Sequence, residues 1–315
     1  MKNPFGAIDE KTLEYRARKA SILKNNPNIQ RLLKGQKNPD ELIEKNLEVL
    51  SSWLDEQERC FHCQGLSFCP KARNSIAGHT SELMFDQDGF INQVLVECRY
   101  QKEKNASRAH LKKIWINQMD SDAQLADLGK LDLKIESMPY VQSYMNLLGS
   151  VNTDFGIYLY GQAGVGKSFL LSGLANKYAR EGSSVCFVRC PQLISDIKDH
   201  FNDDDYRREM LWNLSNCNVL FLDDIGSEAS SAWARDDILF PVLDFRLNHH
   251  KKTYFSSNLS MEELARQYVS AREHNSEVAV SRLMDRIRAM AMPNLLQGES
   301  RRKSPSPESL NQNIF

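Results

Sequence analysis

The chain has 315 residues, enough for two domains, and its 40 Lys and Arg nearly balance its 41 Asp and Glu. The net charge of −1 argues against a general polycation, so any surface for nucleic acid has to be local. Charged residues interrupt positions 1–54 every few residues, so we expect no signal peptide, no membrane partner and a cytoplasmic location. Disulfides are not expected in that reducing compartment, so clustered cysteines indicate a metal site.

The first segment, residues 10–54, is polar and helix-prone. Apolar residues between Leu42 and Leu54 recur at helical spacing, which predicts one helix of about three turns with a single apolar face. We expect this face to pack against its own small domain. Binding of a partner is the alternative, because a small domain has little core in which to bury such a face.

A cluster of candidate metal ligands follows: Cys60, Cys63, Cys69, His79 and Cys98. A C-x2-C pair can place two thiolates on one tetrahedral zinc ion, and more distant residues complete the site. Gly78 indicates a turn that presents the next imidazole. We therefore predict a structural zinc site formed by Cys60, Cys63, His79 and Cys98, with Cys69 as the substitute for His79. Ordinary buried or surface cysteines are the alternative.

Residues 99–113 are basic, with six Lys and Arg and one Glu. Such a run is usually a solvated linker or helix face, and contact with nucleic acid is the less favoured alternative. We predict a small helical zinc-binding domain over residues 1–104, a linker over 105–134, an ATPase domain over 135–300 and a disordered tail over 301–315. The tail has Pro305 and Pro307 among serines.

A phosphate-binding loop follows the apolar run Gly156–Tyr160 and precedes a helix-like segment from Phe169. Its glycines allow the tight turn that points backbone N–H groups at an anion, and the helix dipole favours negative charge there. In this motif Lys167 reaches the β- and γ-phosphates and the Ser168 hydroxyl ligates Mg²⁺. The residues predicted to bind nucleotide are Gly161, Gln162, Ala163, Gly164, Val165, Gly166, Lys167, Ser168 and Phe169.

Apolar runs at 156–160, 185–188, 219–222 and 253–256 alternate with helix-like stretches. This alternation predicts an α/β fold, with a parallel sheet flanked by helices and nucleotide bound beyond the carboxyl ends of the strands. One run ends in Asp223 and Asp224. Buried carboxylates need a partner or a metal ion, so we predict Asp223 in the Mg²⁺ shell and Asp224 as the residue that orients or deprotonates the attacking water.

Further polar residues follow these acids. Asn258 ends the next apolar run and is placed to bond the γ-phosphate or the water, although Asn in this position is often only a turn former. Arg282 and Arg286 are one turn apart on a predicted helix. Ion pairs on the helix surface are their usual role, and contact with a neighbouring subunit's γ-phosphate is the functional alternative. Arg301 offers another guanidinium for the phosphates.

The order of these motifs resembles the AAA+ ATPases of the replicative helicase-loader group. The phrases 222–228, 233–236 and 255–258, together with the cysteine cluster, are similar to the DnaI type within that group. The resemblance covers nearly the whole chain. It implies that the zinc domain binds a hexameric replicative DNA helicase, while the ATPase domain binds ATP and single-stranded DNA and acts with other primosome proteins.

The resemblance also implies residue roles. Asn258 corresponds to the first phosphate sensor and Arg301 or Arg302 to the second, while Arg286, or else Arg282, supplies the finger between subunits of a self-oligomer. Many relatives have Glu at the position of Asp224, and the shorter Asp leaves the rate of hydrolysis open. The rival classes are a transposition-helper ATPase acting on duplex DNA, a metabolic P-loop kinase and a helicase adaptor that senses ATP without hydrolysing it.

Overall fold

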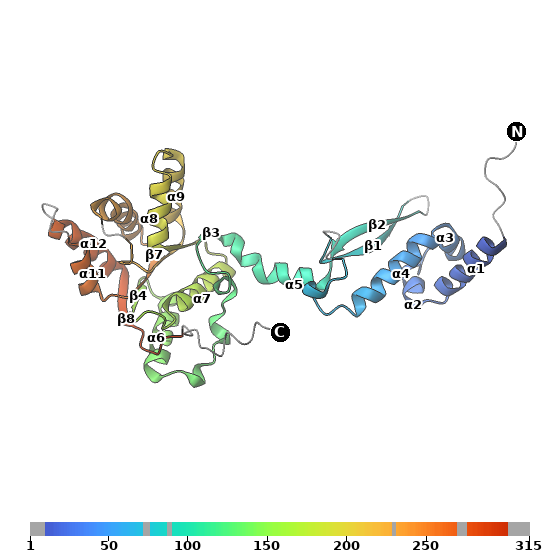
Figure 1. Ribbon diagram of the computed structural model, residues 1–315, viewed down its shortest axis with the longest axis horizontal. Helices are drawn as coiled ribbons and strands as arrows, with labels where there is room; N and C mark the ends of the chain where they lie inside the picture. The colour runs from blue at the N-terminus through green and yellow to red at the C-terminus, as the bar shows by residue number, and fades with distance from the viewer. Residues whose placement is uncertain (1–9, 72–75, 87–89, 229–230, 270–275, 302–315) are drawn as a thin grey trace, which may run out of the picture. The chain divides into compact units, whose positions relative to one another are not determined.

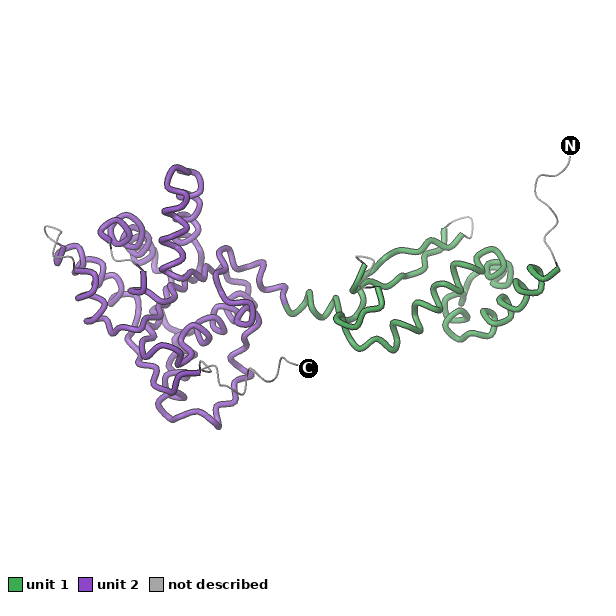
Figure 2. Tube along the Cα trace, in the orientation of Figure 1, with its two compact units in different colours: residues 1–107 green, residues 108–315 purple. Residues whose placement is uncertain are grey.

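The computed structural model describes residues 10–71, 76–86, 90–228, 231–269 and 276–301. The chain divides into two compact units, residues 1–107 and residues 108–315 (Figure 2). The predicted tail and Arg302 lie outside the described residues, apart from Arg301. Each unit has a hydrophobic core of its own.

Unit 1, residues 1–107, consists of short helices and a two-stranded antiparallel hairpin. Its elements are α1 (Glu10–Lys24), α2 (Pro27–Leu32), α3 (Pro39–Lys45), α4 (Leu47–Phe61), η1 (Leu66–Phe68), β1 (His79–Phe85), β2 (Ile91–Glu97) and α5 (Arg99–Arg108) (Figure 1). Leucine and isoleucine side chains of the first four helices pack together with Ile91 of the hairpin. The predicted apolar face thus packs against its own unit.

The single helix predicted between Leu42 and Leu54 is wrong, because the chain breaks at Asn46 into α3 and α4. Asn46 has backbone angles outside the helical region, with φ −117° and ψ 25°. Its side-chain amide donates to the Leu42 carbonyl at 2.9 Å and accepts from the Ile91 N–H at 3.1 Å. A buried asparagine therefore competes with the helix ladder and ties the helices to the hairpin.

Unit 2, residues 108–315, is built on a six-stranded sheet in which every pairing is parallel. The strand order is β3-β5-β6-β7-β4-β8. The strands are β3 (Ile114–Asn117), β4 (Gly156–Tyr160), β5 (Val185–Arg189), β6 (Val219–Asp223), β7 (Lys252–Ser257) and β8 (Ala291–Leu295). This confirms the predicted α/β class with a parallel sheet flanked by helices.

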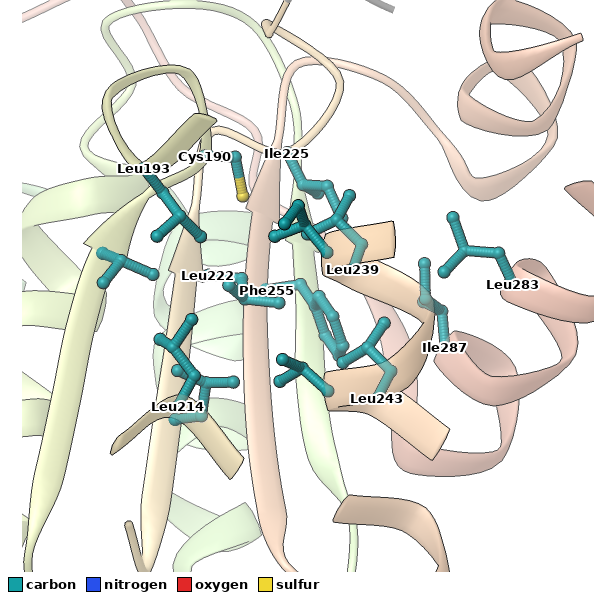
Figure 3. Packing of buried hydrophobic residues seen from close by; sticks show 14 of the residues in the cluster. Cys190, Leu193, Leu214, Leu222, Ile225, Leu239, Leu243, Phe255, Leu283 and Ile287 are labelled. Atoms are coloured by element: carbon teal, nitrogen blue, oxygen red, sulfur yellow. The ribbon is translucent and has the colours of Figure 1, made fainter. Parts of the chain in front are cut away.

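Both faces of the sheet are covered, because successive side chains of a strand point to opposite faces. The longer helices of unit 2 are α6 (Met138–Gly149), α7 (Lys167–Arg180), α8 (Cys190–Asp199), α9 (Asp204–Asn216), α10 (Phe240–Asn248), α11 (Met261–Tyr268) and α12 (Ser276–Met290). On β6, Val219 and Phe221 join the core beneath α6 and α7, whereas Leu220 and Leu222 join the core beneath α8, α10 and α12. Figure 3 shows this second core, in which Leu222 and Phe255 of the sheet lie among leucines of the covering helices.

Short helical turns complete the unit. They are η3 (Ala109–Lys113), η4 (Ala123–Leu125), η5 (Leu128–Lys130), η6 (Leu133–Ile135) and η7 (Ser150–Asn152), together with the π-helical turn η8 (Ala234–Leu239) before α10. None of the helices in the described ranges is long and apolar enough to span a lipid bilayer.

The segment predicted as a linker, residues 105–134, is largely part of unit 2. Its residues 114–117 form β3, which pairs with β5 at the edge of the sheet. Ile114, Met119 and Leu128 are buried in the core beneath α7. The polar composition of the segment gave no indication of this strand, because a short edge strand contains few apolar residues. Its pairing also depends on a strand about 70 residues later in the sequence.

Candidate functional site

The phosphate loop joins the carboxyl end of β4 to the first turn of α7. Gly166, the residue before α7, has φ 104°, a left-handed conformation that favours glycine. Gly161 approaches other backbone so closely that a Cβ there would lie 2.3 Å from the Leu296 carbonyl oxygen. Glycine is therefore required at both ends of the loop by its geometry.

Lys167 begins α7, and its ammonium is buried within the loop. It donates to the carbonyl oxygens of Gly161 at 2.8 Å and Gln162 at 2.9 Å, and to Oδ1 of Asn258 at 2.8 Å. The loop thus places a fixed positive charge where the motif binds phosphate.

Asp223 ends β6 and is 2% exposed. Ser256 Oγ donates to its Oδ1 at 2.5 Å, and the Ser168 side chain also hydrogen-bonds to this carboxyl group. Burial raises the pKa of Asp223 above its usual 3.8, although both hydroxyls act in the opposite direction. A carboxylate beside a serine hydroxyl offers the oxygen ligands that Mg²⁺ prefers, so Ser168 and Asp223 fit the ion.

A stability measurement tests this burial. The pKa of Asp223 is higher in the folded protein than in the unfolded chain. The free energy of unfolding therefore falls as the pH rises from the unfolded-state pKa through the folded-state pKa. Above both values the full cost of burying the charged carboxylate is present. Asp223→Asn removes the charge and keeps an oxygen for Ser256. We expect the free energy of unfolding without Mg²⁺ to rise by about 1–3 kcal/mol at pH 7.5, and less near pH 4. Denaturant titrations check this, with exposed Asp237→Asn as control; the same gain at both pH values contradicts it.

Asp224 follows the strand with φ 59°, an uncommon conformation for a residue other than glycine. Its N–H donates to Ser256 Oγ at 2.9 Å, and its Oδ1 accepts from Asn258 Nδ2 at 3.1 Å. Asn258 therefore lies between Lys167 and Asp224. Its side-chain oxygen accepts a hydrogen bond from the Lys167 ammonium, and its side-chain nitrogen donates one to the Asp224 carboxylate. The strand order explains this, because β7 lies between β4 and β6.

Arg301 reaches the same site from beyond β8. Its N–H donates to the Gly164 carbonyl at 2.9 Å, and its Nη2 lies 2.7 Å from Glu136 Oε2. Its guanidinium is 4.5 Å from the ring centroid of Tyr140. The structure thus brings Arg301 to the phosphate loop, as its predicted role requires.

These side chains enclose a pocket of about 550 Å³. The pocket is lined by Asp120, Ala163, Gly164, Gly166, Lys167, Ser168, Phe169, Arg189, Asp223, Asp224, Asn258 and Arg301. Of the predicted loop residues, Val165 is buried in the core below, and Gly161 and Gln162 contribute the carbonyls that hold Lys167.

Three residues at this site were not predicted from the sequence. Asp120 and Arg189 line the pocket, and Tyr140 lies beside the loop. The buried Tyr140 hydroxyl lies 3.6 Å from the place of a Cβ on Gly166 and has no hydrogen-bond partner among the described residues. Burial raises the pKa of Tyr140, which keeps the hydroxyl protonated. Only Arg189 had a signal in the sequence, as a charged residue that ends an apolar run.

The two arginines of α12 differ in their surroundings. Arg286, the residue preferred as the finger, donates from Nε and Nη2 to Asp244 Oδ1 of α10, both at 3.0 Å. Its guanidinium also lies 5.2 Å from the Phe240 ring centroid. Arg282 is exposed and has no ion-pair partner among the described residues. The contact of Arg286, or else Arg282, with a neighbouring subunit stays a prediction.

In unit 1 the five zinc candidates line one cavity of about 850 Å³: Cys60, Cys63, Cys69, His79 and Cys98. All four cysteines are reduced and partly buried. Within the described part of the chain, no three His, Cys, Asp or Glu side chains are grouped closely enough to hold a metal ion. The ligands share a cavity, but their present positions do not form a coordination site.

Several features of unit 2 define a P-loop nucleotide-binding domain of the AAA+ type. They are a parallel sheet, a phosphate loop after β4, two adjacent acids at the end of β6 and an asparagine after β7, the strand between β4 and β6. A family model described as IstB-like ATP binding protein matches residues 80–309. Over 267 residues the chain is 30% identical to the replicative helicase loader DnaI of Bacillus subtilis (strain 168), covering 83% of this chain and 84% of that protein.

The replicative helicase loader DnaC of Escherichia coli (strain K12) is 26% identical over 161 residues, which cover 51% of this chain and 58% of DnaC. A crystal structure of DnaI has a TM-score of 0.51 and 32% identity, and the match covers 56% of this chain and 94% of that one. The chain therefore belongs to the IstB-like ATP-binding proteins and, among them, to the DnaI-type replicative helicase loaders.

Proposed function

We propose that this chain is an ATP-dependent helicase loader: unit 1 binds the hexameric replicative DNA helicase, and unit 2 binds and hydrolyses ATP while the helicase is delivered onto single-stranded DNA. The match to DnaI carries this proposal, because it covers 83% of this chain. Unit 2, residues 108–315, is too short to account for that share by itself. Relatedness therefore extends into unit 1. Other primosome proteins and further copies of this chain are the remaining proposed partners.

The nucleotide site supports hydrolysis. Lys167 bonds the β- and γ-phosphates, Asn258 holds the attacking water or the γ-phosphate, and Asp224 orients that water or accepts its proton. Ser168 and Asp223 would hold Mg²⁺, which would supply positive charge beside the phosphates. Arg301 adds a second positive charge at the loop. Hydrolysis removes the contacts that only a triphosphate makes, so ATP acts as a switch between assembly and release.

The rival classes are less well supported. An insertion-sequence ATP-binding protein from Pseudomonas fluorescens, which is 33% identical, matches 33% of this chain, whereas DnaI matches 83%. A metabolic kinase would need an acceptor site, and no motif for one was found in the sequence. An adaptor that senses ATP without hydrolysing it differs from a slow ATPase only in rate, which a turnover assay measures.

We also propose that the cavity of unit 1 binds one zinc ion. Cys60, Cys63 and Cys98 line it together with both candidates for the fourth ligand, His79 and Cys69. Zinc would require four of these side chains to close to roughly 2.0–2.3 Å from the ion. Metal binding of this kind contributes directly to folding, which suits a unit with a small core.

A fragment experiment tests the division of labour. Residues 1–113, which contain unit 1 and its core, are expected to co-purify with the host's replicative helicase and to contain about one zinc per chain. Residues 108–315, the matched control, are expected to leave the helicase behind. Elemental analysis and affinity co-purification provide the two readouts. A zinc-containing fragment that does not retain the helicase would remove the main support for the loader assignment.

A further inference from the structure

Arg189 is a cation of the nucleotide pocket to which neither the motifs nor the proposed chemistry gives a role. It ends β5 and pairs in register with Asp223, the last residue of β6. Its Nε lies 3.9 Å from Asp223 Oδ2, and its Nη2 lies 2.6 Å from Asp120 Oδ2. It lines the pocket together with Lys167 and Arg301.

Asp120 lies in the segment that follows β3, and hydrogen bonds on both sides of it in the sequence hold this segment in place. Gln118 donates its N–H to the Phe187 carbonyl at 3.0 Å, and its Oε1 accepts from the Arg189 N–H at 2.8 Å. The Gln118 side chain also donates to Asp196 at 3.0 Å. The Asp120 carbonyl accepts from the first residues of the next turn, Ala123 at 2.9 Å and Gln124 at 3.1 Å. Asp120 is therefore attached to β5 and to η4.

The charges of the pocket indicate what the guanidinium can bind. The Asp120 side chain is 71% exposed and that of Arg189 is 35% exposed, so their ion pair is weak by itself. A terminal phosphate has more charge than a carboxylate and offers three acceptor oxygens. Because a guanidinium has five N–H donors in a planar fork, Arg189 can donate to such a phosphate and keep its bond to Asp120.

We propose that Arg189 contacts the terminal phosphate of ATP bound in its own subunit, and that Asp120 is a positioning residue for this guanidinium. The inference builds on the proposed ATP role of the pocket. It also gives β3 a function, because the chain enters unit 2 at Arg108 and reaches Asp120 through η3 and β3. Loss of the terminal phosphate alters the partners of Arg189 and thereby the restraint on the segment that leads from unit 1.

Nucleotide binding by the full chain tests the first part. Arg189→Gln is expected to weaken binding of a non-hydrolysable ATP analogue by about 10-fold or more, and binding of ADP less than about threefold, in fluorescence competition with Mg²⁺. Arg207→Gln, which removes a half-buried arginine paired with Asp204 on α9, is the control and should change neither. Equal losses for both nucleotides, or no loss, overturn the proposal. Failure of the wild-type chain to bind ATP would instead refute the proposed function.

Hydrogen exchange tests the coupling. In the wild type, the ATP analogue is expected to slow amide exchange over residues 118–126 more than ADP does. Asp120→Asn should abolish this difference and Asp120→Glu should partly restore it, whereas Asp122→Asn, a change at an exposed neighbour, should leave it intact. An unchanged difference in Asp120→Asn overturns the positioning role, and thermal melts confirm that each variant is folded.

Discussion

Replacing Lys167 by alanine is expected to weaken ATP binding by about 100-fold or more, because the ammonium supplies charge-assisted bonds to the phosphates. The buried position of Lys167 inside the loop makes water a poor substitute. The measurement is a titration of the full chain with a fluorescent ATP analogue in the presence of Mg²⁺. ATP turnover should fall to background in the same preparation.

Lys177 provides a matched control on the same helix. Its side chain is 42% exposed and pairs with Glu181, so Lys177→Ala should bind ATP like the wild type. Lys167→Arg separates charge from shape, because it keeps the charge but not the compact ammonium held by the Gly161 and Gln162 carbonyls. ATP affinity that survives Lys167→Ala in a folded protein would show that this loop does not bind the triphosphate.

Replacing Asp224 by alanine is expected to lower the rate of ATP hydrolysis by about 100- to 10,000-fold and to leave ATP affinity within about threefold. In the proposed function its carboxylate acts on the attacking water, whereas Lys167, Ser168 and Asp223 hold the nucleotide. Turnover should be measured with and without single-stranded DNA. Asp237→Ala, at an exposed aspartate of the same unit, is the control.

The same experiment distinguishes the loader from an ATP-sensing adaptor. A wild-type rate that stays at background with single-stranded DNA and helicase present would support the adaptor. A measurable wild-type rate that Asp224→Ala leaves unchanged would exclude Asp224 from the hydrolytic step. In that case Glu228, a buried acid bonded to the Gly226 N–H, would be the next carboxylate to examine.

The parts of the site that the sequence predicted are those encoded in short, contiguous patterns. The phosphate loop, the acids after β6 and Asn258 after β7 each follow an apolar run, and parallel strands bring their carboxyl ends to one edge of the sheet. The order of motifs therefore sufficed to predict that these side chains meet. The bridge made by Asn258 depends on strand order, which the motifs alone do not specify.

The parts that were missed depend on contacts between residues far apart in the sequence. Asp120 enters the pocket only because β3 pairs with β5, and Arg286 has a partner only because α10 packs beside α12. Tyr140 meets Gly166 through the packing of α6 against the loop. The candidate zinc ligands are intermediate. Their spacing predicted that they lie near one another, and they line one cavity, but the described residues do not form a coordination site.

The internal partners of Lys167 affect how strongly ATP can bind. Its three donors meet two carbonyl oxygens and the oxygen of Asn258, so an arriving phosphate exchanges one good acceptor for another. Phosphate is an anionic acceptor and these three oxygens are neutral, so the exchange still favours ATP, by the surplus of a bond between opposite charges over a bond from a cation to a neutral oxygen. The net contribution of Lys167 to affinity is therefore large but smaller than the full strength of its bonds to the phosphates.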